Sequence, residues 1–186
     1  MVRSTAVAVV SLAMVSPALT LLTGCEPKTR ALFTKPELFT YERLAVLGLD
    51  REQEQLFMAA YFKTFISQPI TFVERGELEK IIGEQDLREG RLNDKTRARA
   101  RQILGVEALI LCEYSKDEAR AGNAMKLRVR VVDSETGAIV GSVLTENYKD
   151  FEDHAETAVK ALKADLLSGG YRRSYPTPME PPSTTQ

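Results

Sequence analysis

Short apolar runs alternate with amphipathic segments between residues 41 and 171, and this alternation constrains the fold of the chain more than any other feature. Runs such as Arg43 to Leu49 and Ala108 to Cys112 have the length of buried strands, whereas the segments between them repeat apolar residues at helical spacing. The predicted element order is β-α-β-α-α-β-β-β-α. Such an order favours a single α/β domain in which helices flank a mixed β-sheet.

Each predicted helix has an apolar face or a clear end signal. Phe57, Tyr61 and Phe65 fall four residues apart, and Asp50 can cap the helix that carries them. A helix that ends at Gly105 is also predicted, because glycine readily adopts the left-handed conformation found after helix ends. This helix is predicted to start at Asn93 or Asp94, with Ala100, Ile103 and Leu104 facing inward. Two further helices are predicted over 77–88 and 151–167.

A different period marks the strands after residue 124. Three basic residues, Lys126, Arg128 and Arg130, alternate with apolar ones, which predicts a strand with one face in water. The turn residues from Asp133 to Gly137 then lead into a partner strand at 139–145.

The first residues have the three parts of an export signal that ends in a lipidated cysteine. Arg3 gives a positive start, residues 6–22 carry no charge, and Leu22-Thr23-Gly24-Cys25 resembles a lipobox. The apolar run is shorter than a membrane-spanning helix and contains a proline. We therefore predict a signal peptide over 1–24 and a membrane anchor of acyl chains such as palmitate on Cys25. An uncleaved anchor helix, or an ordinary signal with an incidental cysteine, is the alternative.

The residues around the predicted domain indicate where it is held. Glu26 follows the cysteine where an aspartate would favour inner-membrane retention in enterobacterial lipoproteins, so we expect the periplasmic face of the outer membrane. Residues 25–40 are predicted to be the lipidated cysteine and a short tether, which reaches at most about 50 Å. Residues 172–186 hold four prolines and are predicted to be a disordered tail.

The sequence gives no pattern of a catalytic, metal-binding or cofactor-binding site, so we expect a protein without enzymatic activity. His154 is the single histidine and is predicted to be a solvated helix residue. Metal-ligand spacings and a glycine-rich phosphate loop are missing from the sequence. With Cys25 lipidated, Cys112 has no intrachain partner and is predicted to be a small buried core residue.

The pattern of charged residues bears on the possible binding partners. A net charge of −1 does not favour nucleic acid as a partner. Basic residues gather around the third helix and on the wet strand face, where they are either solvated or in contact with an anionic partner or a neighbouring subunit of a homo-oligomer. The candidate contact residues are Arg91, Lys95, Arg99, Lys126, Arg128 and Arg130.

Several segments resemble the CsgG family of bacterial envelope lipoproteins, the superfamily of the curli assembly and transport component. Glu74 and Arg75 belong to one of these motifs and are predicted to end a strand and open a helix, where a carboxylate can meet free backbone amides. The resemblance covers most of 41–171 and implies a periplasmic α/β domain with a role in assembling a cell-envelope structure. The segments are Val73-Glu74-Arg75 with Leu78, Ile81-Ile82 and Glu84 to Leu87, then Ile103 to Ile110, then Asp133 to Ile139 with Thr136-Gly137, and Arg43 to Asp50 as the first strand.

The chain departs from that family in one important respect. The curli secretion channel has two long hairpins that form a membrane barrel, whereas here the first insertion point holds only the short, charged residues 115–123. After Thr145 the chain runs directly into a predicted helix. We therefore expect an interaction or assembly module. An LpoB-like activator of a peptidoglycan synthase, a ring subunit of a curli-type channel and an envelope enzyme are the alternatives.

Overall fold

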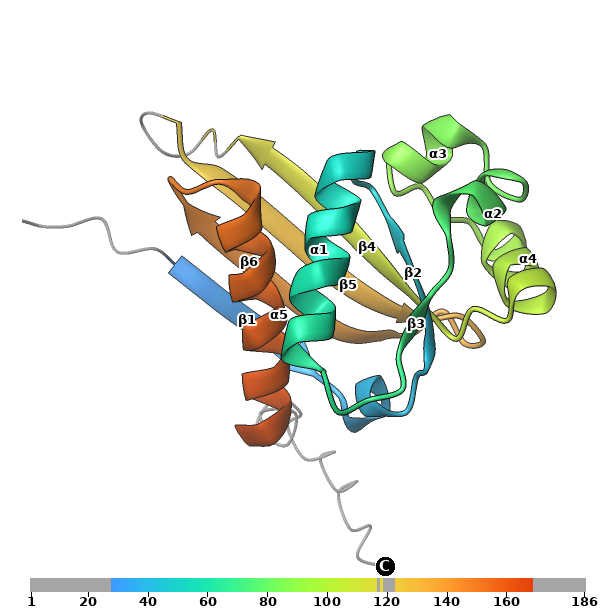
Figure 1. Ribbon diagram of the computed structural model, residues 1–186, viewed down its shortest axis with the longest axis horizontal. Coiled ribbons are helices and arrows are strands. Elements are labelled where there is room, and N and C mark those ends of the chain that lie inside the picture. Colours follow the sequence, from blue (N-terminus) through green and yellow to red (C-terminus); the bar gives the residue numbers. More distant parts are fainter. Residues whose placement is uncertain (1–27, 117, 119–122, 169–186) are drawn as a thin grey trace, which may run out of the picture.

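The computed structural model describes residues 28–116, 118 and 123–168, which form a six-stranded sheet with helices on both faces (Figure 1). The strand order is β1-β6-β5-β4-β2-β3. The predicted α/β class is therefore confirmed. In chain order the elements are β1 (Lys28–Thr34), the 3-10 helix η1 (Pro36–Phe39), β2 (Arg43–Leu47), α1 (Arg51–Thr64), β3 (Thr71–Phe72), α2 (Arg75–Glu79), α3 (Glu84–Arg88), α4 (Asp94–Leu104), β4 (Ala108–Lys116), β5 (Met125–Asp133), β6 (Ile139–Asn147) and α5 (Phe151–Ser168).

Two kinds of strand pairing meet in this sheet. β2 runs parallel to β3 and to β4, and α1 connects β2 with β3. β4, β5 and β6 follow one another as antiparallel neighbours, and β1 returns from the N-terminal side to pair antiparallel with β6. The sheet is therefore mixed, as predicted, and β1 and β3 are its two edges.

The helices cover the two faces unequally. α1 and α5 lie side by side across one face, where Phe57, Tyr61 and Leu162 pack on the buried residues of the sheet (Figure 1). α2, α3 and α4 pack against the other face near β2 and β4, around Leu47 and Leu109. Within the described residues, no helix of this second layer covers β6 or β1.

The start of α1 shows how local sequence sets an element. The Asp50 side chain accepts a hydrogen bond from the Gln53 backbone N–H at 2.9 Å, and the Gln53 side chain accepts one from the Asp50 N–H at 3.4 Å. This capping box satisfies two amides that have no partner inside the helix. Phe57, Tyr61 and Phe65 are buried on one face, which confirms the predicted cap and the predicted core residues.

Residues 28–40 belong to the folded domain, and this corrects the tether predicted over 25–40. β1 pairs with β6 from Lys28 opposite Glu146 to Thr34 opposite Gly141, and Leu38 of η1 is only 1% exposed. An edge strand is held largely by backbone hydrogen bonds to its neighbour. Such a strand needs no sustained apolar period, so the sequence pattern did not reveal it.

Two helix predictions also need correction. The helix predicted over 77–88 is two short helices, α2 and α3, separated by a turn that ends at Gly83. Ile103, predicted to face inward, is 61% exposed. Ala100 is fully buried and Leu104 is half-buried, so the inward face of α4 is centred between them and leaves Ile103 on its flank.

The remaining end predictions lie outside the described residues. These are the signal peptide over 1–24, the lipidated Cys25 and the tail over 172–186. None of the helices in the described part of the chain is both long and apolar enough to cross a membrane.

Candidate interaction surface

The second face of the sheet carries no helical layer in the described structure over β6, β1 and the part of β5 before Val132, which itself packs with α2, α3 and α4. The side chains of this face lie in register across the three strands. A row places Glu146 of β6 opposite Lys126 of β5. We call this surface the open face. The two further rows, read from β1 through β6 to β5, are Arg30–Leu144–Arg128 and Phe33–Ser142–Arg130.

Positive charge dominates the open face. Arg30, Arg128 and Arg130 are exposed, and Lys126 is half-buried. Arg128 forms an ion pair with Glu113 of β4, with 3.1 Å between Nη1 and Oε2. An exposed ion pair of this kind contributes little to the stability of the fold. Arg128 can therefore leave Glu113 and pair with a carboxylate of another protein at a low cost in free energy. The predicted wet face of β5 is thus where three of the candidate contact residues lie.

The structure separates the other three candidate residues from that row. Arg91 pairs with Glu89 at 2.6 Å, whereas Lys95 and Arg99 are exposed on α4. Another basic residue of α4, Arg97, which was not among the candidate contact residues, reaches the β5–β6 turn. Its guanidinium donates hydrogen bonds to the carbonyl oxygens of Ser134 and Glu135 at 2.8 and 2.7 Å and so holds the β5–β6 turn.

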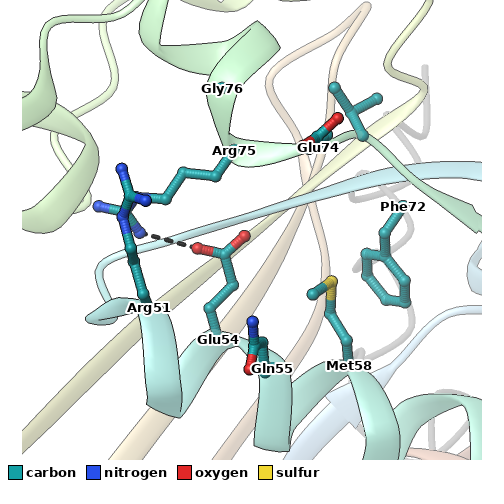
Figure 2. A pocket seen from close by; sticks show the side chains of 9 residues that line it. Arg51, Glu54, Gln55, Met58, Phe72, Glu74, Arg75 and Gly76 are labelled. Atoms are coloured by element: carbon teal, nitrogen blue, oxygen red, sulfur yellow. Dashed lines mark hydrogen bonds and ion pairs between the residues drawn. The ribbon is translucent and has the colours of Figure 1, made fainter.

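A pocket of about 430 Å³ lies on the other side of the molecule, between α1 and the segment from β3 to α2 (Figure 2). Its apolar wall consists of Met58, Phe72 and Val73. A buried ion pair lies beside this wall, with 2.7 Å between Arg75 Nη1 and Glu54 Oε2. Arg51, Gln55, Glu74 and Gly76 complete the lining.

Arg75 is the most connected charged side chain of this region. It is 8% exposed and donates hydrogen bonds to Glu54, Glu79 and Glu84, and to the Leu49 carbonyl oxygen at 3.1 Å. Burial opposes its charge, but the hydrogen bonds to Glu54 and Glu84 raise the pKa of Arg75 above its usual value. It is therefore a structural cation that joins three elements.

Sequence analysis missed this network. Glu74 occupies the N-cap position of α2 as expected, but its side chain makes no capping hydrogen bond, so the predicted contact with free amides is wrong. A signal was available in α1, because Glu54 lies three residues before Phe57 and thus on the apolar face of the helix. A charge on a buried face indicates a buried partner.

His154 corrects another prediction, since it is buried rather than solvated. Its exposed fraction is 0%, and Nδ1 lies 2.6 Å from Thr145 Oγ1. The Tyr114 ring meets the imidazole edge-on at 5.4 Å, and Nε2 has no hydrogen-bond partner among the described residues. Burial lowers the pKa of His154, although Asp153 and Asp150 act against this. A neutral core imidazole is the result.

Other reactive groups have ordinary surroundings in the described structure. Cys112 is buried, as predicted, and burial raises the pKa of its thiol, which keeps it protonated. In the described part of the chain, no group of three or more histidine, cysteine, aspartate and glutamate side chains could hold a metal ion.

Comparison with known proteins gave likenesses of fold alone. No family model and no curated protein matches the chain, so the resemblance to the CsgG family stays a prediction. The chain is similar to PelC of Paraburkholderia phytofirmans, solved as a dodecamer, with 12% identity, a TM-score of 0.47, and 76% of this chain and 97% of that chain covered. It is also similar to the LpoB C-terminal domain of Salmonella enterica, with 14% identity, a TM-score of 0.44 and coverages of 58% and 83%. A lipoprotein of Neisseria meningitidis is similar as well, with 12% identity and a TM-score of 0.41. The match covers 72% of this chain and 99% of that chain.

Proposed function

We propose that this chain is a lipid-anchored envelope protein that acts as an interaction and assembly module without catalysis, and that its open face binds an acidic surface of a partner protein in the periplasm. The observation that carries the proposal is the open face itself. It presents exposed arginines in register on β1 and β5, with Leu144 between two of them. An apolar centre with a charged rim is typical of protein–protein interfaces.

The position of β1 sharpens this proposal. Only Glu26 and Pro27 separate Cys25 from β1, so a lipid on Cys25 holds the first strand within roughly 10 Å of the anchor. The partner surface then lies close to the same membrane, which we take to be the outer one. This short connection disfavours an LpoB-like activator that reaches a synthase in the inner membrane.

Self-association is a second candidate, supported by β1. This seven-residue strand is an edge of the sheet, and Leu32, at the irregularity in its pairing with β6, is 56% exposed. Edges of this kind readily pair with another chain. A ring of copies, as in a curli-type assembly, would give a defined oligomer by light scattering of the detergent-solubilised full chain.

In-cell crosslinking tests the main proposal. A photoreactive residue replaces Leu144 in the full-length protein, and adducts are identified by mass spectrometry in intact cells. We expect one envelope protein to be trapped, and we expect Arg128→Glu with Arg130→Glu to abolish that adduct. The matched control is Lys95→Glu with Arg99→Glu, which reverses two exposed charges of α4 and should leave the adduct intact.

The outcomes separate the candidates. Adducts of the chain with itself would support the ring. Equal loss in both double variants would indicate a general effect of charge and would contradict the assignment of the open face.

A further inference from the structure

Another pocket, of about 220 Å³, lies at the border of the open face, where the helices of the second layer end. The start of α4 and residues of β4, β5 and β6 contribute to it. α4 lies close to the β5–β6 turn (Figure 1), and the two hydrogen bonds from Arg97 to the carbonyl oxygens of this turn fix that side of the pocket. The lining residues are Leu92, Asn93, Asp94, Arg97, Leu111, Arg130, Val132, Gly137 and Ile139.

Four of the lining residues are aliphatic. Leu111 of β4 and Val132 of β5 belong to the buried cluster under α2, α3 and α4, and Leu92 packs against the same cluster. Ile139 lies directly opposite Val132 in the pairing of β5 with β6, yet it is 38% exposed. The pocket therefore offers an aliphatic surface that a side chain from another molecule can cover.

The charges of the lining favour an anion. Arg97 and Arg130 stand against one acid, Asp94, so the lining carries a net charge of +1. Arg97 is already engaged within the fold, because it holds the turn and lies 3.2 Å from Asp94. Arg130 is exposed, and among the described residues it has no hydrogen-bond or ion-pair partner. Its guanidinium is therefore the group that is available to a carboxylate from outside.

The sheet places Arg130 beside aliphatic residues and without an acid directly across from it. Its cross-strand neighbours are Leu111 on β4 and Ser142 on β6, and both are uncharged. Glu113, two residues further along β4, is paired with Arg128. An unpaired guanidinium beside an exposed aliphatic surface is complementary to a carboxylate that lies next to an aliphatic group.

We propose that this pocket anchors the acidic partner by taking an aliphatic side chain that is directly followed by an aspartate or a glutamate. This inference rests on the proposed function, because it assigns a local sequence to the acidic surface that binds the open face. The aliphatic side chain contacts Leu111, Val132 and Ile139, and the carboxylate accepts hydrogen bonds from Arg130. Binding energy at interfaces concentrates on a few side chains in such pockets, and arginine is enriched among them.

A peptide titration tests this inference. The probe is acetyl-Gly-Ser-Leu-Asp-Ser-Gly-amide, added to the isotope-labelled full chain in detergent micelles. We expect the backbone amide signals of Arg130, Gly137 and Ile139 to shift, with a Kd in the millimolar range. Asparagine in place of the aspartate should weaken binding at least about threefold, because the ion pair is lost. Alanine in place of the leucine should weaken it roughly tenfold, because less apolar surface is buried.

Variants of the chain locate the contact. Arg130→Gln should remove the preference for the aspartate peptide over the asparagine peptide. Ile139→Thr keeps a β-branched side chain in β6 but reduces its apolar surface, so it should weaken the leucine peptide about threefold and retain the preference for aspartate. Arg99→Gln is the matched control, since it removes an exposed arginine of α4 outside the pocket lining, and it should bind like the parent chain.

The outcomes distinguish this inference from the proposed function. Equal losses in Arg99→Gln and Arg130→Gln, equal binding of the aspartate and asparagine peptides, or no shift at about 10 mM peptide would overturn the inference. Shifts that concentrate on β1 and Arg128 would also overturn it and would leave the open face as the binding surface. The crosslink from Leu144 in intact cells measures the proposed function separately, and its absence together with peptide binding at Arg130 would contradict that function and not the pocket.

Discussion

Arg75 and Glu54 form a buried ion pair at 2.7 Å that joins α2 to α1 across 21 positions of sequence. Arg75→Ala would leave the Glu54 carboxylate buried without its partner, and we expect a loss of about 3–5 kcal/mol in the free energy of unfolding. Urea denaturation of the full chain measures this. Lys80→Ala removes only an exposed pair with Glu77 and should change stability by less than about 0.5 kcal/mol. Losses of equal size in the two variants would contradict a structural role for Arg75.

His154 should make stability depend on pH. The pKa of His154 is lowered in the folded state. Below about pH 6.5 the unfolded chain therefore binds a proton at this histidine that the folded chain does not bind. The stabilising effect is complete above that pH and is lost as the pH falls, with a slope of up to about 1.4 kcal/mol per pH unit. Free energies of unfolding at about pH 7 and pH 5 test this, and His154→Phe should flatten the slope. An unchanged slope in His154→Phe would contradict the assignment of this pH dependence to His154.

Gly48 and Gly76 should respond to alanine in opposite directions. Gly48 has φ +90°, and an added Cβ would clash with the backbone carbonyl of Cys112. We expect Gly48→Ala to cost at least about 2 kcal/mol. Gly76 lies in α2 with nothing within 4 Å of an added Cβ, so Gly76→Ala should be stabilising by about 0.5–1 kcal/mol. Thermal unfolding of both variants measures the difference, and a tolerated Gly48→Ala would mean that β2 and β4 separate more easily than their pairing indicates.

Cys25→Ala should release the chain from the membrane and leave its fold intact. The expected result is a shift from the membrane pellet to the soluble periplasmic extract, because the acyl anchor is lost. Cys112→Ala, which changes a buried thiol in β4, is the control and should stay in the pellet. A Cys25→Ala protein that still sediments with membranes would contradict the assigned anchor.

The elements predicted correctly are those whose physics is local. Asp50 and Gln53 are three residues apart and cap α1, and the Asp133 side chain accepts hydrogen bonds from the Glu135 and Thr136 amides within its own turn. Gly105 has φ +66° and ends α4. In each case the residues that fix the local conformation lie within a few positions of one another, so the sequence alone is sufficient to predict the cap, the turn or the helix end.

The mispredicted features depend on partners that are distant in the chain. The sequence predicts a tether where the structure has β1, because the partner strand β6 lies more than a hundred residues away. His154 lies three residues after Phe151 and four before Ala158, so the helical period placed it on the buried face, but its polarity argued for solvent. Thr145 and Tyr114, which surround the imidazole, could not be located without the fold.

The sequence by itself determined an α/β chain with an alternating strand at β5, capped helices and a candidate lipid anchor at Cys25, because periodicity and turn chemistry act over a few residues. Only the tertiary structure decided which charged side chains lie on an exposed face and which are buried as ion pairs. It placed Arg128 and Arg130 on an open face that β5 shares with β6 and β1, and it buried Glu54 next to Arg75 toward the opposite edge. Burial and cross-strand register are properties of the assembled sheet, and they depend on contacts that no local pattern contains.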